Sequence, residues 1–203
     1  MFLFFRLRNG LSAALFRLMF GHFFRSFGRR ARLVAPLGIE GIGNISIGDD
    51  VYVAHKVLLA AVPHTGAGKC TLEIGSGTSL GSFNHIYATE RISIGENVLT
   101  ANNVYISDNV HGYEDTTVPV KQQSVKQKNL VTIGDGAWLG QNVCVVGASV
   151  GKNSVIGANS VVTRDIPDYA VAVGAPARII RRFDPAAQLW RATNAAGEFI
   201  SAP

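Results

Sequence analysis

The 203-residue sequence contains little cysteine, no long uninterrupted apolar run and no acidic residue near its N-terminus. Its two cysteines, Cys70 and Cys144, lie far apart and form no CxxC pair, which argues against a disulfide framework and against a cysteine-ligated metal site. The glycines match neither a P-loop nor the GxGxxG loop of a dinucleotide-binding domain. We therefore expect none of these sites.

The segment before Val34 carries seven arginines and no acidic residue, although the whole chain has a net charge of only +5. A membrane-spanning helix needs about 20 mostly apolar residues, and arginines interrupt the phenylalanine- and leucine-rich run. A signal peptide would place its charge ahead of the apolar core. We predict that residues 1–33 form an amphipathic segment and that residues 1–32 contact the membrane peripherally, on the cytoplasmic side of the inner membrane. The alternative is a helix that caps the domain or packs within an oligomer.

The sequence is rich instead in a six-residue repeat, which is clearest in residues 131–162. A period of six fits neither the helical period of 3.6 nor a long alternating strand. It predicts a coil of short strands with aliphatic side chains inside and glycine or asparagine at the corners, and the coils must stack to cover their open edges. The repeated aliphatic positions in this segment are Ile133, Leu139, Val145, Val150, Ile156 and Val162.

The same repeat extends back to about residue 40, and polar segments interrupt it twice. We assign the repeat domain to residues 34–182, with excursion loops at residues 60–71 and 112–130. Long polar loops in compact domains usually carry function, which draws attention to the second loop. Asp184 and Pro185 form a typical helix start, so we predict a short helix and a tail over residues 183–203.

His111 lies where one repeat ends and the loop at residues 112–130 begins. A neutral imidazole has a pKa near ~6.5 and can take a proton from a hydroxyl group at cellular pH. The alternative is an ordinary surface histidine, and spacing alone leaves both interpretations open.

The repeat over residues 40–182 resembles that of the hexapeptide-repeat acyltransferases, which are left-handed parallel β-helices. The resemblance implies an all-β fold, and the run NVLTANNVYISDNVHGYED resembles a segment of the sugar O-acetyltransferases of this superfamily. There the histidine before the protruding loop is the catalytic base, which corresponds to His111. Asn84 matches an asparagine that contacts the acceptor, and the alternative is a corner asparagine stacked in the coil, which repeat proteins commonly use. Glu114 and Asp115, close to His111 in sequence, are candidates for orienting it or for binding a sugar hydroxyl group.

Two later segments, GDGAWLGQNV and AVGAPARII, resemble the parts of this family that hold the acyl donor. The resemblance implies that Trp138 lies near the pantetheine arm and that Pro176 and Arg178 lie near the adenosine end of coenzyme A. Guanidinium groups bind phosphate with forked geometry. Backbone N–H groups around residues 138–140 are candidates for stabilising the oxyanion. The full set of residues expected at the donor is Trp138, Gly140, Ala158, Arg164, Pro176 and Arg178.

The resemblance implies an acetyl-CoA-dependent O-acetyltransferase that acts on a sugar hydroxyl group in surface polysaccharide or lipopolysaccharide biosynthesis. The family is trimeric, with sites between subunits, so we expect a homotrimer with acetyl-CoA as co-substrate, no metal and no nucleic acid. The sequence leaves open whether the acceptor is free, nucleotide-linked or lipid-linked. Alternatives are N-acetylation of an amino sugar, a non-catalytic scaffold, and a metal enzyme of the γ-carbonic-anhydrase type, which the dispersed histidines disfavour.

Overall fold

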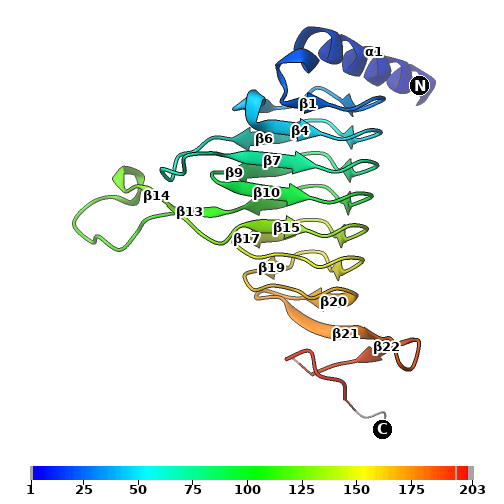
Figure 1. Ribbon diagram of the computed structural model, residues 1–203, viewed down its shortest axis with the longest axis vertical. Helices are drawn as coiled ribbons and strands as arrows, with labels where there is room; N and C mark the ends of the chain where they lie inside the picture. The colour runs from blue at the N-terminus through cyan, green and yellow to red at the C-terminus, as the bar shows by residue number, and fades with distance from the viewer. Residues whose placement is uncertain (1, 195, 201–203) are drawn as a thin grey trace.

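The computed structural model describes residues 2–194 and 196–200, and it places one long helix across the end of a three-sided coil (Figure 1). The helix α1 (Phe2–Phe20) is followed by a 3₁₀ turn, η1 (Gly21–Phe23), before the chain enters the coil. Among the described residues, no helix is long and apolar enough to cross a membrane.

Each face of the coil is a sheet of short parallel strands, one strand from each turn of the coil. The first face contains β1 (Ser26–Phe27), β4 (Ile45–Ile47), β7 (Thr71–Ile74), β10 (Arg91–Ile94) and β15 (Val131–Ile133). The second face contains β2 (Arg32–Leu33), β5 (Tyr52–Val53), β8 (Ser79–Leu80), β11 (Leu99–Thr100), β16 (Trp138–Leu139), β18 (Val155–Ile156) and β20 (Ala170–Val173). The third face contains β3 (Gly38–Glu40), β6 (Leu58–Ala61), β9 (His85–Ala88), β12 (Tyr105–Ser107), β17 (Cys144–Val146) and β19 (Val161–Val162).

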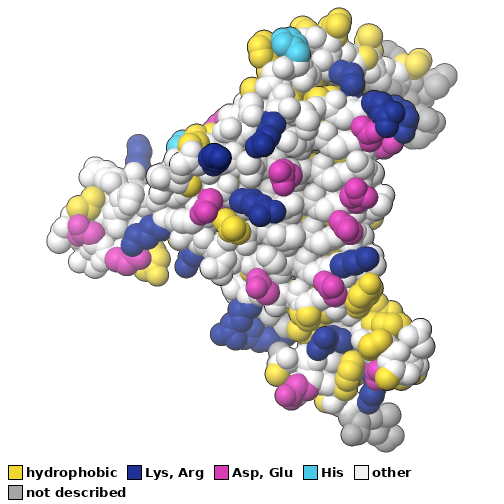
Figure 2. All heavy atoms as spheres, viewed as in Figure 1, with side chains coloured by type: hydrophobic (Ala, Val, Ile, Leu, Met, Phe, Trp, Pro, Cys, Tyr) yellow, Lys and Arg dark blue, Asp and Glu magenta, His cyan; other side chains and the backbone are white. Residues whose placement is uncertain are grey.

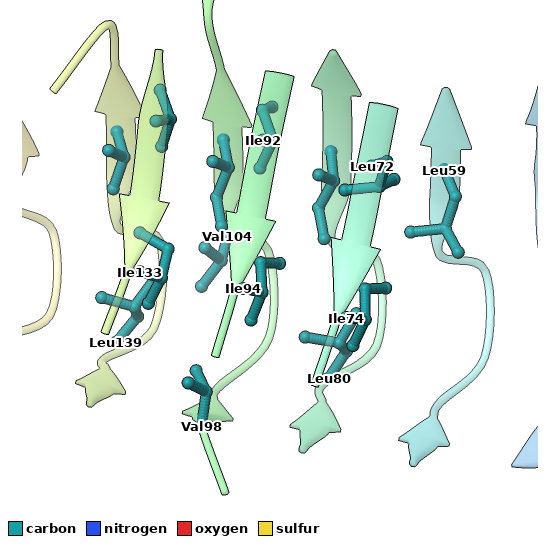
Figure 3. Close-up of a cluster of buried hydrophobic side chains, with 14 of the residues drawn as sticks. Leu59, Leu72, Ile74, Leu80, Ile92, Ile94, Val98, Val104, Ile133 and Leu139 are labelled. Carbon is teal, nitrogen blue, oxygen red and sulfur yellow. The ribbon is translucent and has the colours of Figure 1, made fainter. Parts of the chain in front are cut away.

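The core is a stack of aliphatic side chains that point into the coil from all three faces (Figure 3). On the first face Ile74, Ile94 and Ile133 are partners in register, so one inward side chain lies directly above the next. All three are buried. Burying such a side chain stabilises the fold by roughly 1.5–3 kcal/mol. The six-residue repeat in the sequence therefore corresponds to one face of the coil, with a buried aliphatic side chain at the same place on each face.

Asparagines occupy many of the corners between strands in a left-handed backbone conformation. Asn103 and Asn159 have φ angles of +59° and +60°, values that asparagine tolerates better than most other residues. Successive coils also approach closely at corners. A Cβ atom added to Gly140 would lie 2.7 Å from the backbone nitrogen of Ala158, so this corner requires glycine.

The loop after the fourth strand of the third face leaves the coil as a hairpin. It contains β13 (Asn109–His111) and β14 (Val125–Gln127), which pair antiparallel, with the 3₁₀ turn η3 (Val120–Gln122) between them. Figure 1 shows this excursion projecting from the side of the coil. A shorter excursion lies between β6 and β7, and the 3₁₀ turn η2 (Ile42–Asn44) precedes β4. The hairpin begins at Asn109, three residues before the predicted loop at residues 112–130.

The two ends of the coil differ from the predicted boundaries. The coil begins at β1, within the segment assigned to the amphipathic N-terminus, because β1 pairs with β4. The predicted C-terminal helix is wrong, since β21 (Arg178–Asp184) and β22 (Leu189–Ala192) extend the second face as antiparallel strands. Asp184 does accept hydrogen bonds from the N–H groups of Ala186 and Ala187, at 3.0 and 3.2 Å. These bonds close a turn, and Gln188 at φ +52° turns the chain back.

Candidate active site

His111 ends strand β13 at the mouth of a cavity of about 510 Å³ between the third face and the hairpin. Its side chain is exposed, and it has no hydrogen-bonding or ionic partner within the described part of the chain. The hairpin fixes its backbone, because His111 pairs with Val125 and the N–H of Gly112 donates to the carbonyl of Ser124 at 2.9 Å. The cavity is lined by His64, His85, Tyr87, Tyr105, Asn109, Val110, His111, Val125 and Val146.

Aromatic rings from two neighbouring coils form the wall of this cavity. His85 and Tyr105 are partners in register on β9 and β12, and their ring centroids lie 5.4 Å apart in an edge-to-face arrangement. The Tyr87 hydroxyl group is hydrogen-bonded to Nδ1 of His64. Burial lowers the pKa of His85 and so favours the neutral ring. The negative charge of Glu40 opposes this effect but does not outweigh it.

The sequence analysis did not identify this wall. The available signal was the alternation within β9 and β12. His85 and Tyr87 flank the buried Ile86, and Tyr105 precedes the buried Ile106, so the alternation of a strand points these three side chains outward. Outward aromatic residues on neighbouring coils predict that these rings share one surface. They do not predict that the β13–β14 hairpin covers this surface and makes it a cavity.

Asp108 anchors the strand that carries His111. Its fully buried carboxylate accepts hydrogen bonds from the backbone N–H groups of Thr89, Glu90 and Arg91, at 2.8, 2.8 and 2.9 Å. The Thr89 hydroxyl group and the Asn109 amide also donate to it. Burial acts to raise the pKa of Asp108, but these hydrogen bonds outweigh it and the pKa is lowered. A buried anion thus holds the third face to the base of the hairpin.

Gln127 joins the two excursions to the coil beneath His111. Its amide nitrogen donates to the Asp108 carbonyl at 2.9 Å. Its amide oxygen accepts hydrogen bonds from the hydroxyl groups of Thr65 and Thr89, both at 2.8 Å, and the single Thr89 hydroxyl proton is shared between Gln127 and Asp108. Because Thr65 lies in the shorter excursion, one side chain connects three segments that are distant in sequence. This network supports the backbone around the cavity.

Glu114 and Asp115, predicted to orient His111 or to bind a sugar, form their interactions within the loop. Glu114 forms an ion pair with Lys126 at 2.7 Å, and this contact, with hydrogen bonds from backbone N–H groups, lowers its pKa to about 2. Asp115 accepts hydrogen bonds from the hydroxyl and N–H groups of Thr117, which lower its pKa. Neither carboxylate contacts His111.

Asn84 is buried inside the coil, with only 1% of its surface exposed. Its amide nitrogen donates to the Thr100 hydroxyl group, and its amide oxygen accepts a hydrogen bond from the Val104 N–H at 2.8 Å. Binding an acceptor would require an exposed amide, so the structure contradicts the predicted acceptor contact. Asn84 instead stabilises a corner of the coil, the alternative that repeat proteins commonly use.

Most of the residues expected at the acyl donor lie along one corner, between the second and third faces. Gly140 and Ala158 are adjacent there on successive coils. The segment containing Pro176 follows on the next coil, because the carbonyl of Gly174 accepts a hydrogen bond from the Val161 N–H at 3.0 Å. We call this row the donor corner; it comprises Gly140, Ala158 and residues 174–177. The exposed Trp138 lies two residues before Gly140, and Arg178 directly follows the row.

Two other groups predicted at the donor lie outside the donor corner of the same chain. Arg164 lies beyond β19, at the opposite edge of the third face, where neighbouring Asp165 accepts a hydrogen bond from the Ser149 N–H at 2.7 Å. It is therefore separate from the donor corner. The backbone N–H groups of Trp138 and Gly140 donate to the carbonyls of Ser154 and Ile156, both at 2.8 Å. They already take part in the coil, so they do not form an oxyanion site.

His111 and the donor corner lie at opposite edges of the third face. The hairpin leaves the coil after β12, whereas the donor corner precedes the strands of that face. Within one chain the candidate base and the candidate donor residues therefore do not meet. In the described residues, no group of three or more histidine, cysteine, aspartate or glutamate side chains is placed to hold a metal ion.

The chain is similar in sequence to several known proteins. The family model described as the hexapeptide repeat of succinyl-transferase matches residues 130–164. A putative lipopolysaccharide biosynthesis O-acetyl transferase of Escherichia coli is 30% identical over 174 residues, which cover 82% of this chain and 86% of the relative. The galactoside O-acetyltransferase of Escherichia coli is 41% identical over 98 residues, which cover 46% of this chain and 45% of that protein.

A solved structure of similar fold is an N-acyltransferase from Bacillus cereus in complex with dTDP and 3-hydroxybutyryl-CoA. It superposes with a TM-score of 0.69 and 20% sequence identity, covering 81% of this chain and 86% of that chain. At this identity the likeness establishes the fold. The predicted left-handed parallel β-helix is thereby confirmed.

Proposed function

The chain belongs to the hexapeptide-repeat acyltransferases, and from that premise we propose that it transfers an acetyl group from acetyl-CoA to a sugar hydroxyl group. The acyltransferase class follows from the family. The sugar hydroxyl acceptor is supported by the names of two relatives, a lipopolysaccharide biosynthesis O-acetyl transferase and a galactoside O-acetyltransferase. We place the reaction in the synthesis of a surface polysaccharide or lipopolysaccharide.

The observation that carries the proposal is the unpartnered imidazole of His111 at the mouth of an aromatic-lined cavity. In the proposed reaction, His111 takes the proton of the acceptor hydroxyl group while its oxygen attacks the thioester carbonyl carbon. The carbon–sulfur bond then breaks, and the proton passes from the imidazolium to the sulfur of the leaving CoA. The products are the acetyl ester and free CoA, and no covalent intermediate with the enzyme is required.

The cavity wall suits a sugar acceptor. The rings of Tyr87, His85 and Tyr105 offer apolar faces beside polar edges, a combination that packs against a sugar ring and bonds its hydroxyl groups. Among the cavity residues, we propose that Tyr105 and His85 contact the acceptor.

We propose that the complete site forms between two copies of the chain in a homotrimer. His111 of one copy would face the donor corner and Trp138 of the next, which explains why these groups lie at opposite edges of the third face. Pro176 and Arg178, at the C-terminal end of the donor corner, are proposed to contact the adenosine end of coenzyme A. Arg178 is exposed and has no acidic partner among the described residues.

The test is acceptor-dependent release of CoA from acetyl-CoA, measured across sugars, amino sugars, nucleotide sugars and lipid-linked saccharides. We expect His111→Ala to lower kcat by about 10²–10⁴-fold, the usual contribution of general base catalysis. His55→Ala is the control, because His55 lies on the coil and does not line the cavity.

Three results would change the proposal. Release that survives His111→Ala would keep the transferase but reject this base. Release with amino sugars alone, accompanied by amide rather than ester products, would replace O-acetylation with N-acetylation. No release with any acceptor, together with no acetyl-CoA binding, would favour a non-catalytic scaffold.

A further inference from the structure

Helix α1 lies across the N-terminal end of the coil, with one side packed on it and the other facing outward (Figure 1). Ala13 is buried at 3% exposure, and Phe16 packs against the core cluster. Residues on the opposite side of a helix lie about half a turn away, at a spacing of 3.6 residues per turn. The side opposite Ala13 and Phe16 contains Leu7, Leu11 and Leu18.

These three leucines are the most exposed large apolar side chains of the helix among those described. Leu7 is 65% exposed, Leu11 73% and Leu18 78%. Their spacing of four and then seven residues keeps them on one stripe of the helix. The stripe is widened by Leu15, Met19 and Phe23, which are also exposed. Figure 2 shows hydrophobic side chains along this end of the molecule. We call these six exposed residues the leucine stripe: Leu7, Leu11, Leu15, Leu18, Met19 and Phe23.

The surroundings of the leucine stripe are positively charged. No acidic residue precedes Glu40 in the sequence, whereas seven arginines do. Two of these, Arg29 and Arg30, are neutralised by ion pairs with Asp49 and Asp50. Arg17 and Arg25 are exposed and have no carboxylate partner among the described residues. Arg17 is held on the coil side of the helix, where its guanidinium donates to the Gly28 carbonyl at 2.7 Å.

We propose that the leucine stripe docks on an anionic lipid membrane, with the leucines at the acyl boundary and the arginines at the level of the headgroups. An apolar stripe with cations beside and behind it is the arrangement of helices that lie in the membrane interface. A second copy of this chain would bring like-charged ends together, which opposes docking between copies. Charge complementarity therefore favours the lipid surface.

Docking through α1 fixes the orientation of the whole molecule. Because the helix lies across the end of the coil, the coil axis stands away from the membrane plane (Figure 1). Strands in a sheet are about 4.8 Å apart. Trp138 lies on the fifth strand of the second face and Trp190 on the ninth, so they lie about 19 and 38 Å beyond the first strand. Both native tryptophans should be held clear of the lipid.

The first experiment measures sedimentation of the full chain with vesicles of phosphatidylcholine that contain about one quarter phosphatidylglycerol. We expect binding that falls with added salt, and little binding to phosphatidylcholine alone. The double variant Leu11→Glu, Leu18→Glu should lower the bound fraction by at least about tenfold. Both side chains are exposed, so the coil should melt at the same temperature. Leu189→Glu is the matched control, since Leu189 is 48% exposed at the other end of the molecule.

The second experiment tests the orientation by quenching of tryptophan fluorescence with brominated lipids in the same vesicles. The native chain should bind without quenching, and the variant Leu11→Trp should be strongly quenched. Equal quenching of the native chain would overturn the orientation.

The proposal fails if the intact chain does not bind anionic vesicles, or if the double glutamate variant binds as well as the native chain. It also fails if the double variant alters the oligomeric state in light scattering without altering vesicle binding, because the stripe would then be an interface between copies. None of these readouts depends on catalysis, so they are independent of the proposed acetyl transfer.

Discussion

At the scale of single residues, Asp108 is a buried anion that holds together two turns of chain around His111. Replacing it with asparagine preserves its shape, but places an amide donor against the backbone donors that now face a carboxylate. Hydrogen bonds to charged groups contribute about 1.5–3 kcal/mol each. We expect Asp108→Asn to lower the free energy of unfolding by about 2 kcal/mol at neutral pH, measured by urea denaturation.

The same substitution predicts a change in acid stability. The pKa of Asp108 is lower in the folded chain than its unfolded value of about 3.9, so the ionised carboxylate stabilises the fold above that pH. This stabilisation is lost as the pH falls through the folded pKa. The difference between the native chain and Asp108→Asn should therefore be full at neutral pH and should shrink below about pH 4. A difference that stays constant into acid would contradict this assignment.

Glu114 lies three residues from His111 in sequence, but its carboxylate is directed to Lys126. We expect Glu114→Gln to leave kcat for acetyl transfer unchanged within experimental error, because no contact links this carboxylate to the imidazole. Asp115→Asn serves as a second comparison, since its partner Thr117 also lies in the loop. A large loss of kcat in Glu114→Gln alone would restore the role expected from the sequence.

Three polar residues illustrate what the sequence can and cannot predict. His111 was identifiable because it interrupts the repeat at the edge of a long loop. Asn84 falls within the repeat, where an asparagine that stabilises a corner and one that binds a ligand look alike. Asp108 was not singled out, because its partners at residues 89–91 and 127 become neighbours only when the coil brings successive turns together.

At the scale of elements, the β13–β14 hairpin depends on Gln127 for its attachment to the coil. We expect Gln127→Ala to lower kcat by roughly tenfold to a hundredfold, because the loss of three hydrogen bonds lets β13 and His111 shift. The affinity for acetyl-CoA should not change, since none of the hydrogen bonds of Gln127 involves a residue of the donor corner.

The matched control is Gln122→Ala, an exposed glutamine of the same loop in η3. Hydrogen exchange gives a second readout, because residues 109–127 should exchange faster in Gln127→Ala only. Equal effects of both substitutions on kcat would show that the loop responds to any change in its composition.

The elements were predictable where the repeat is regular, and not where it ends. Residues 131–162 keep an inward aliphatic residue on every strand, so both the strands and their stacking follow from the period. After β20 the repeat stops, and Asp184-Pro185 has the local chemistry of a helix start. The open edge of the second face decides the outcome, because β21 and β22 pair with it through backbone hydrogen bonds. The local sequence of residues 178–192 does not reveal that an unpaired strand edge lies next to it.

At the scale of the whole molecule, a site shared between copies predicts complementation. One inactive variant is His111→Ala, and the other combines Trp138→Ala with Arg178→Ala. When the two are unfolded together, mixed equally and refolded, some interfaces pair an intact His111 with an intact donor corner. Random assembly into trimers should restore about one quarter of native activity, because each partner is intact at half of the interfaces.

Each variant refolded alone is the control and should stay inactive. No recovery in mixtures whose oligomers are shown to contain both variants would place the complete site within one chain. Such a result would also require a movement that brings the hairpin to the donor corner, which the present arrangement of the third face does not provide.

The number of stacked coils between α1 and the β13–β14 hairpin also sets the height of His111 above the end of the molecule that carries α1. His111 follows the fourth strand of the third face, about 14 Å beyond the first strand. With the width of α1 added, it lies roughly 25 Å above a membrane that holds the leucine stripe. An acceptor carried on a lipid would then present its reactive hydroxyl group only if a spacer of that reach separates it from the bilayer. Removing one complete turn between α1 and β13 would lower the site by about 5 Å, which would shift the enzyme toward shorter lipid-borne chains.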